Sequence, residues 1–285
     1  MPKERKMKTT VKVVLFGVVF PLLLTAAEPV RSVFSVEQLA KSVQTSDIWL
    51  DVNRMNGIFR NNGTWFYDNM MGDWGLEWPK GSGLSPIFAA GQFLCAKIDG
   101  EIRAAGVQHS ATEYQPGLIL TTDNADDKND TKYRWYELHK DGSGDWSDWP
   151  VSQGAPINEN GDPLLLGDMT IYSVWNDLTD HGAYGSNPLN AEIHQLAWAF
   201  DRSDQIGDMI FQKWTIVNKS GKTWDDAYFA IWCDPDLGNG GDDQVGCDTT
   251  LGLGYCWNAT DNDQNYGDDP PAVGFVFFAG SNDNF

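Results

Sequence analysis

A long apolar hairpin at residues 87–108, IFAAGQFLCAKIDGEIRAAGVQ, decides the fold. Two apolar-rich runs, 87–98 and 101–108, flank Asp99 and Gly100. This dipeptide is among the strongest short-range hairpin signals, because both residues tolerate the positive φ angles that a type I′ turn needs. The stretch therefore predicts two long antiparallel strands.

Short strand patterns separated by turn residues fill most of the remaining chain. Apolar or alternating runs predict further strands at 132–139, 170–175, 191–200, 208–217, 227–233 and 272–279. The segment 218–221 (NKSG) predicts a second hairpin, and 121–131 predicts a polar surface loop. Strands do not alternate with helical patterns, as they would in a Rossmann or TIM fold. We expect an all-β protein, an antiparallel β-sandwich of the jelly-roll or immunoglobulin-like class with long acidic loops.

The N-terminus has the three parts of a secretory signal peptide. Residues 1–8 are basic, 13–24 are apolar, and 25–27 (TAA) are small. The apolar run contains Pro21 and is shorter than the ~20 residues that a membrane-spanning helix needs. We expect cleavage after Ala27 and export of a mature chain that has no integral membrane segment.

Three segments are expected along the chain. Residues 1–27 form the signal peptide. Residues 28–56 form a lead-in, in which capping-box spacing at Ser35 favours a short helix to about Gln44. Residues 57–285 form the β-sandwich region. Because the sequence stops almost directly after an apolar strand, we expect this region to be truncated at its C-terminal end.

The chain is strongly acidic. Its 285 residues include 20 Lys and Arg against 40 Asp and Glu, a net charge of −20. Removing residues 1–27, with five bases and one acid, leaves 15 bases and 39 acids, or −24. This charge disfavours binding to nucleic acids and anionic membranes. We expect cell-surface or extracellular glycans or proteins as partners.

Aspartate dominates the acids, with 31 of the 39 in the mature chain. Asp is typical of turns and of oxygen-rich cation sites, and Ca²⁺ accepts short carboxylates from irregular loops. Two acidic segments, 233–248 and 261–269, therefore predict one or two calcium-stabilised loops, with solvated turns as the alternative. The candidate ligands are Asp234, Asp236, Asp242, Asp243, Asp248, Asp261, Asp263 and Asn265.

The cysteines suggest a disulfide, because exported proteins usually oxidise their thiols. We expect one bridge within the group Cys233, Cys247 and Cys256, and the sequence does not choose the pair. Cys95 is expected to be a small apolar residue buried in its strand. A zinc site is disfavoured, since the cysteines lack paired CxxC spacing and neighbouring histidines.

Thirteen tryptophans offer a glycan-binding alternative, because sugar rings stack on exposed aromatic side chains. Five lie beside Gly, Asp or Pro or in turn-rich stretches and are the stacking candidates: Trp65, Trp74, Trp78, Trp146 and Trp149. The competing explanation is core packing, which we expect for Trp198, Trp214 and Trp232.

No catalytic motif is present in the sequence. The patterns GxSxG, HExxH, GxGxxG and the P-loop are absent, and the four histidines, His109, His139, His181 and His194, have no ligand spacing. The enzymatic alternative is a secreted polysaccharide-active hydrolase that uses an Asp/Glu pair. Its usable glutamates are Glu77, Glu101, Glu113, Glu137 and Glu192. Acids are so numerous that chance alone would supply a pair, and we assign no catalytic residue.

Several distinctive stretches carry a family resemblance: MNGIFRNNGTWFYD (55–68), EWPKGSGLSPIFAAGQFLCAKIDGEIRAA (77–105), DWPVSQGAP (148–156), GDMTIYSVWND (167–177) and CDPDLGNGGDDQVGCDTTLGLGYCWN (233–258). Together they resemble the N-terminal region of large secreted proteins from Bacteroidetes-related and marine bacteria. Such proteins commonly continue into fibronectin-like repeats and a C-terminal sorting domain for type IX secretion. The resemblance implies export, surface residence and β-rich architecture, and carries no established activity. No sorting domain follows Phe285, which agrees with a truncated region.

The sequence thus predicts an exported cell-surface or extracellular β-sandwich region with a structural or adhesive role, stabilised by calcium. A glycan-binding module is the first alternative, and a polysaccharide-active hydrolase is the second.

Overall fold

The computed structural model describes residues 46–109 and 111–278. The expected signal peptide at 1–27, the helix at 35–44 and the C-terminal end at 279–285 lie outside the described residues.

The first sheet is built on the predicted hairpin. β7 (Ala89–Ile98) and β8 (Glu101–Gln108) pair antiparallel around Asp99 and Gly100, whose φ angles are 52° and 85°. The sheet runs in the order β1-β2-β3-β7-β8-β9, with β6 paired to β2 and β17 paired to β7. The other strands of this sheet are β1 (Asp47–Leu50), β2 (Asn56–Arg60), β3 (Thr64–Trp65), β6 (Leu76–Glu77), β9 (Ala111–Thr112) and β17 (Asp225–Asp234).

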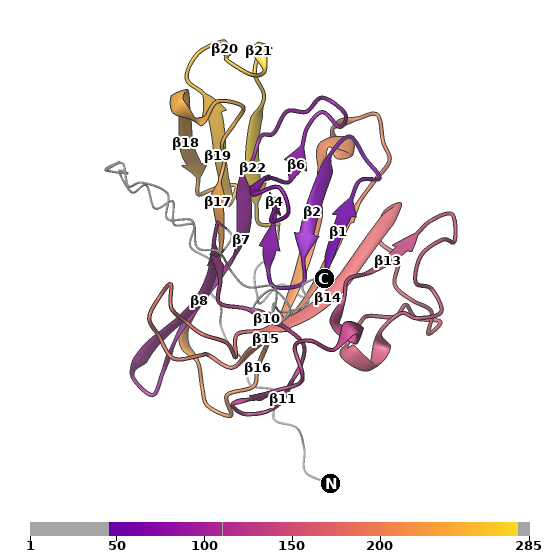
Figure 1. Cartoon of the computed structure of the whole chain (residues 1–285), viewed down its shortest axis with the longest axis vertical. Helices are drawn as coiled ribbons and strands as arrows, with labels where there is room; N and C mark the ends of the chain where they lie inside the picture. Colours follow the sequence, from indigo (N-terminus) through magenta and orange to yellow (C-terminus); the bar gives the residue numbers. More distant parts are fainter. Residues whose placement is uncertain (1–45, 110, 279–285) are drawn as a thin grey trace, which may run out of the picture.

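The second sheet is centred on β14 and β15, and a third, smaller sheet lies at one end of the molecule (Figure 1). The second sheet contains β10 (Gln115–Pro116), β13 (Tyr136–His139), β14 (Met169–Asn176), β15 (Ala191–Ala199) and β16 (Phe211–Asn218). The third sheet contains β18 (Asp243–Asp248), β19 (Leu253–Asn258) and β22 (Ala272–Val276). Every strand pair within the described residues is antiparallel.

Short elements complete the chain. Three small hairpins are β4 (Tyr67–Asp68) with β5 (Asp73–Trp74), β11 (Ile119–Thr121) with β12 (Asn124–Ala125), and β20 (Asn262–Asp263) with β21 (Gly267–Asp268). The helical turns are η1 (Thr131–Tyr133), η2 (Val151–Gln153), η3 (Gln205–Asp208) and η4 (Gly240–Asp242). The predicted all-β, antiparallel sandwich-like fold is therefore confirmed.

The main core lies between the two large sheets. Trp65 of β3 stacks on Trp214 of β16, with ring centroids 5.5 Å apart, and its indole nitrogen donates to Oε1 of Gln195 in β15 (3.3 Å). Trp214 in turn contacts Phe229 of β17 at 5.0 Å. Because β3 and β17 belong to the first sheet and β15 and β16 to the second, these contacts close the sandwich.

The outer face of the second sheet is covered by a long excursion, residues 117–166, that carries its own core. Alternate side chains of β14, such as Tyr172 and Val174, point away from the main core. They pack with Tyr133, Tyr136, Leu138, Trp149, Ala155 and Leu196. The predicted strand at 132–139 starts inside this excursion as η1, and only Tyr136–His139 forms a strand.

The segment 218–221 does not form the predicted hairpin, so that prediction is wrong. β16 pairs with β15 in the second sheet, whereas β17 pairs with β7 in the first. The turn therefore carries the chain across the sandwich, and Trp214 and Phe229 meet through the core instead of along a strand edge. Both arrangements give alternating apolar residues, so the sequence pattern alone does not distinguish them.

A buried polar cluster holds the loop between β14 and β15 against the edge of β8. Both ring nitrogens of His181 face carbonyl oxygens, Nδ1 that of Ala104 (2.8 Å) and Nε2 that of Asp177 (2.7 Å). Carbonyl oxygens only accept hydrogen bonds, so both nitrogens donate only when the ring is protonated. The carboxyl groups of Glu113 and Asp177 each lie 3.8 Å from the ring, and burial raises the pKa of Asp177.

Asp177 is also the acceptor that closes this loop. Its Oδ1 accepts from Ala191 N (2.7 Å) and its Oδ2 from Leu189 N (2.5 Å). We predict that Asp177→Asn lowers the free energy of unfolding by about 1–3 kcal/mol, because an amide NH₂ would leave one buried backbone donor unsatisfied. Urea unfolding measures this loss. Glu101→Gln, at the exposed start of β8 where the side chain accepts from Asn187 of the same loop, should change stability by less than about 1 kcal/mol. Equal losses in both variants would contradict the role of Asp177.

The polar loop at 121–131 is largely exposed, as predicted. Asp126 fixes it to η1, which follows it in the excursion. The Asp126 carboxylate accepts from Lys132 Nζ (2.8 Å) and Tyr133 OH (2.7 Å), and these bonds lower the pKa of Asp126 to about 2. A carboxyl whose pKa is lower in the folded than in the unfolded chain stabilises the fold above its ordinary pKa of 3.8.

We predict that Asp126→Asn is less stable than the parent at pH 7, and that the difference disappears as the pH falls from about 4 to about 2. Chemical unfolding at a series of pH values measures the difference. Asp127→Asn is the matched control, because Asp127 accepts only from its neighbour Asn129. A difference between the Asp126 variant and the parent that does not depend on pH would contradict the assignment.

Candidate functional site

The five stacking candidates among the tryptophans lie in different environments. Trp65 and Trp149 are buried, at 0% and 6% exposure, and serve the two cores. Trp74 and Trp78 are half-buried, and the Trp78 indole donates to Asp208 Oδ1 (2.9 Å). Trp146 lines a pocket in which an aromatic ring and polar groups come together. The structure does not gather the candidates into one binding face.

The three tryptophans expected in the core also differ. Trp214 packs against the main core, and Trp198 packs against the core of the excursion. Trp232 is half-buried, and its ring lies 5.3 Å from that of His109.

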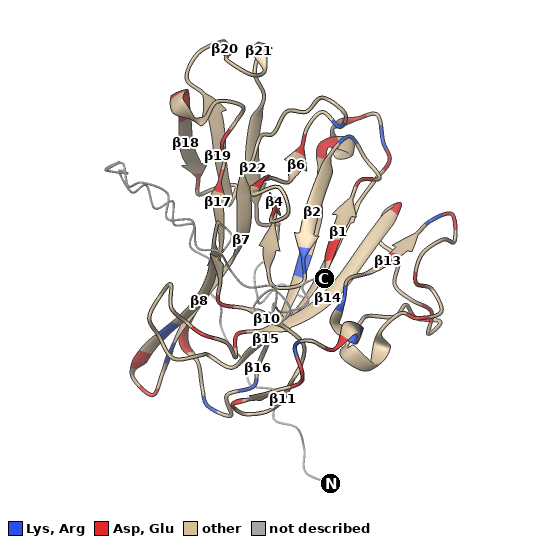
Figure 2. Cartoon of the chain, viewed as in Figure 1, with Lys and Arg blue, Asp and Glu red and all other residues tan. Residues whose placement is uncertain are grey.

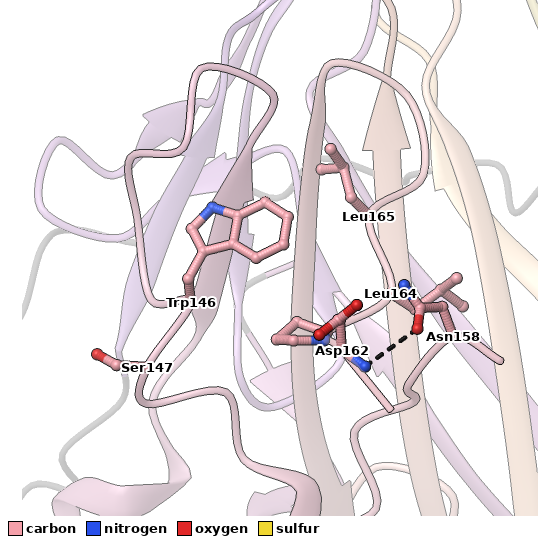
Figure 3. Close-up of a pocket in the computed structure, with 7 residues that line it drawn as sticks. Trp146, Ser147, Asn158, Asp162, Leu164 and Leu165 are labelled. Carbon is pink, nitrogen blue, oxygen red and sulfur yellow. Dashed lines mark hydrogen bonds between the residues drawn. The ribbon is translucent and has the colours of Figure 1, made fainter. Parts of the chain in front are cut away.

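The Trp146 pocket has a volume of about 500 Å³ and lies in the excursion (Figure 3). The indole of Trp146 forms one side, and the segment 158–165 forms the other. Its lining residues are Trp146, Ser147, Asn158, Asp162, Pro163, Leu164 and Leu165. The pocket thus combines an aromatic ring face, two leucines and several polar side chains.

Local hydrogen bonds fix both sides of the Trp146 pocket. The Trp146 indole nitrogen donates to Ser143 O (3.0 Å), which orients the ring. On the other side, Asn158 Oδ1 accepts from the backbone N of Asn160 (2.9 Å) and Asp162 (3.0 Å) and shapes a tight turn. The Asp162 carboxylate makes no hydrogen bond within the described residues and remains available to a ligand.

Trp149 joins the two sides of the pocket without lining it. Its indole nitrogen donates to Pro156 O (2.8 Å), which ties the segment after Trp146 to the turn that carries Asn158. Its ring packs on Tyr172 of β14, with centroids 5.7 Å apart. The sequence predicted a stacking residue at Trp149, and the structure gives it a packing role.

The two acidic segments predicted to hold calcium lie against each other. Asn239 N donates to Asp263 Oδ2 (3.0 Å), and Asn265 Nδ2 donates to Gly238 O (2.8 Å). Acidic residues occur mainly in loops and at strand ends, including the turn between β17 and β18 (Figure 2). The two acidic segments thus form one neighbourhood instead of two separate loops, although not all of the candidate ligands face it.

Asp243 lies in the middle of this neighbourhood. Its Oδ2 accepts from Leu237 N (2.7 Å). Burial, together with the negative charges of Asp236, Asp242 and Asp263, raises the pKa of Asp243 to about 6. A carboxyl under such repulsion favours a proton or a cation nearby.

Four other candidate ligands face elsewhere. Asp234 lies 3.3 Å from His109 Nδ1, and Asp248 caps a turn through Thr250 N (2.8 Å). Asp261 lines a second, smaller pocket of about 250 Å³ beside Trp257. The Nδ2 of Asn265 donates to the carbonyl of Gly238, as described above. No group of three or more His, Cys, Asp or Glu side chains among the described residues is arranged to hold a metal ion.

The expected disulfide is not formed, because all four cysteines are free thiols. In the register of β18 and β19, Cys247 is opposite Gly254 and Cys256 is opposite Val245, so the two cysteines do not face each other directly. The Cys256 thiol donates instead to Pro235 O (3.6 Å), and burial raises the pKa of Cys256 to about 12. Cys95 is half-buried within β7.

The usable glutamates are each bound to partners and line neither pocket. Glu77 accepts from Gly83 N (2.7 Å), and Glu101 pairs with Arg103. Glu113 belongs to the buried His181 cluster, and Glu192 lies 3.1 Å from His194 Nε2. The remaining one, Glu137, is paired with His139 at 3.3 Å.

No family model, curated protein or solved structure matches the chain. None of the helices in the described ranges is long and apolar enough to cross a membrane.

We predict that the two tryptophans of the excursion differ sharply in their contribution to stability. Trp149→Ala removes a buried ring and the bond to Pro156 and should cost about 3–5 kcal/mol of unfolding free energy. Trp146→Ala removes a half-buried ring and should cost about 1 kcal/mol. Urea unfolding compares the two, and similar losses would show that Trp146 is a core residue.

Proposed function

We propose that this chain is an exported, cell-surface or extracellular β-sandwich region with an adhesive role, and that it adheres by binding glycans in the Trp146 pocket. The observation that supports the binding role is the arrangement of Trp146 opposite Asn158 and Asp162 across a cavity of about 500 Å³. Export rests on the signal-peptide pattern at residues 1–27 and on the resemblance to secreted surface proteins.

The pocket offers the two kinds of contact that a sugar ring needs. The apolar C–H face of a pyranose packs on an aromatic ring such as Trp146. Hydroxyl groups at the ring edge can donate to the Asp162 carboxylate and exchange hydrogen bonds with Asn158 and Ser147. A neutral glycan fits better than an acidic one, because the pocket lining contains a carboxylate and no Lys or Arg.

The hydrolase alternative receives less support from the same pocket. A glycosidase needs two carboxyl groups about 5–10 Å apart at the scissile bond. Among the residues that line the Trp146 pocket, Asp162 is the single acid. The arrangement therefore favours binding over cleavage.

A glycan array with the purified chain tests the proposal. We predict binding to one class of neutral sugar, and we predict that Trp146→Ala weakens it by about 30-fold, since removal of a central Trp costs about 2 kcal/mol in a binding site. Trp49→Ala is the matched control, because Trp49 is 40% exposed on β1 and lies outside the pocket. Binding that survives in the Trp146 variant, or no binding to any sugar class, would contradict the proposal.

A further inference from the structure

Three buried oxygen atoms without a hydrogen-bond partner in the described residues occur where β18 begins. They are Oδ1 of Asp242, Oδ1 of Asp243 and Oδ1 of Asn258. A buried polar atom without a partner costs about 1–3 kcal/mol, so three in neighbouring residues call for a physical explanation. All three are acceptors when the carboxyls are ionised, so the group that satisfies them must be a donor or a cation.

Asn258 points to this place independently of the acidic residues. Its side chain is only 7% exposed, and its Nδ2 donates to Thr260 O (3.0 Å) and Asn262 O (3.1 Å), which fixes the amide orientation. The register of β18 and β19 puts Asn258 directly opposite Asp243, so their side chains leave the same face of the sheet. The buried amide oxygen is thereby presented beside the Asp243 carboxylate.

The loop before β18 brings further carboxylates to the same place. Ala259 N donates to Asp242 O (3.0 Å), which holds Asp242 at the end of β19 next to Asn258. The Asp236 carboxylate packs against Gly240, where any side chain would collide with it. Gly240 therefore allows Asp236 to fold inward over the loop.

Positive side chains do not neutralise these groups. Among the described residues, no ion pair with Lys, Arg or His involves Asp236, Asp242 or Asp243. His109 is the histidine paired with an acidic residue next to this turn, and its partner is Asp234 at the end of β17. The negative charge at the start of β18 thus has no cationic side chain as a partner among the described residues.

We propose that the turn between β17 and β18 binds one divalent cation of the calcium type, with the amide oxygen of Asn258 and the carboxylates of Asp242 and Asp243 as its central ligands. Asp236 supplies a further carboxylate. This site does not depend on glycan binding. It replaces the two loops expected from the sequence with one site, and it includes Asn258, which was not among the ligands expected from the sequence.

The oxygen set explains the choice of ion. Ca²⁺ takes six to eight oxygen ligands at about 2.3–2.6 Å and accepts amide, carboxylate and water oxygens in irregular geometry. In the described residues the carboxylates are not yet close enough together to hold a metal ion. Binding therefore requires the loop that carries Asp236 and Asp242 to move towards β19. Zn²⁺ would instead recruit the nearby thiol of Cys256.

Thermal unfolding of the purified chain with Ca²⁺, and then with a chelator at equal ionic strength, tests the site. We expect a melting temperature about 5 °C or more higher in saturating Ca²⁺. Asp243→Asn should abolish most of this shift, and Asn can still accept the hydrogen bond from Leu237 N. Asp248→Asn is the matched control with the same change in charge, since Asp248 caps a turn at the other end of β18.

A second variant should increase the shift in melting temperature with Ca²⁺ instead of abolishing it. Asn258→Asp adds a carboxylate to the proposed ligands, so we expect lower stability in the chelator and a larger shift with Ca²⁺ than in the parent. Tb³⁺ luminescence excited through tryptophan gives an independent titration of the parent and both variants.

Four outcomes would overturn the proposal. They are no shift with Ca²⁺ in the parent, an equal loss of shift in the Asp243 and Asp248 variants, a shift with Zn²⁺ but not with Ca²⁺, and a smaller shift in the Asn258 variant. An Asp243 variant that is more stable than the parent in Ca²⁺ and in chelator alike would assign the buried oxygens to a proton instead of a metal ion.

Discussion

The contact of Trp65 with Trp214 and Gln195 is the interaction on which the rest of the molecule depends. It joins a short strand of the first sheet to the adjacent strands β15 and β16 of the second, through ring stacking at 5.5 Å and one buried hydrogen bond. The second sheet is thereby fixed with one face on the core and the other face outward. Because that outer face is apolar at Tyr172 and Val174, it requires a cover, and the excursion that covers it carries the Trp146 pocket.

The local signals in the sequence predicted strands better than they predicted which strands pair. Asp99 and Gly100 both adopt positive φ, as the type I′ turn requires, so the hairpin of β7 and β8 follows from its own residues. The segment 218–221 carries a similar turn signal, yet its flanking strands belong to different sheets. The difference arises from tertiary packing, because Trp214 and Phe229 contact each other across the core and so place their strands in different sheets.

The sequence indicated which types of residue form the candidate sites, but it did not indicate which individual residues come together in them. Trp146 and Trp149 lie in the same turn-rich stretch, and only the position of the Pro156 carbonyl makes one of them a buried anchor. Asn258 lies outside the two acidic segments and becomes important because strand register places it opposite Asp243. The His181 cluster is hidden in the same way, since its partners Ala104, in β8, and Glu113, between β9 and β10, are distant from it in sequence.

The position of β17 has a consequence for the order in which the protein assembles. β17 pairs with β7 from Asp234 opposite Ala89 to Asp225 opposite Lys97. During synthesis, one edge of β7 therefore stays unpaired until β17, which lies more than 100 residues further along the chain, has been made. Until then β7 presents unpaired backbone groups along an apolar strand, the kind of edge that pairs with other chains. Folding of the first sheet is therefore governed by long-range pairing and is slow compared with that of the local β14–β15–β16 meander. A chain released or cleaved before residue 225 would keep that edge open and would aggregate through it.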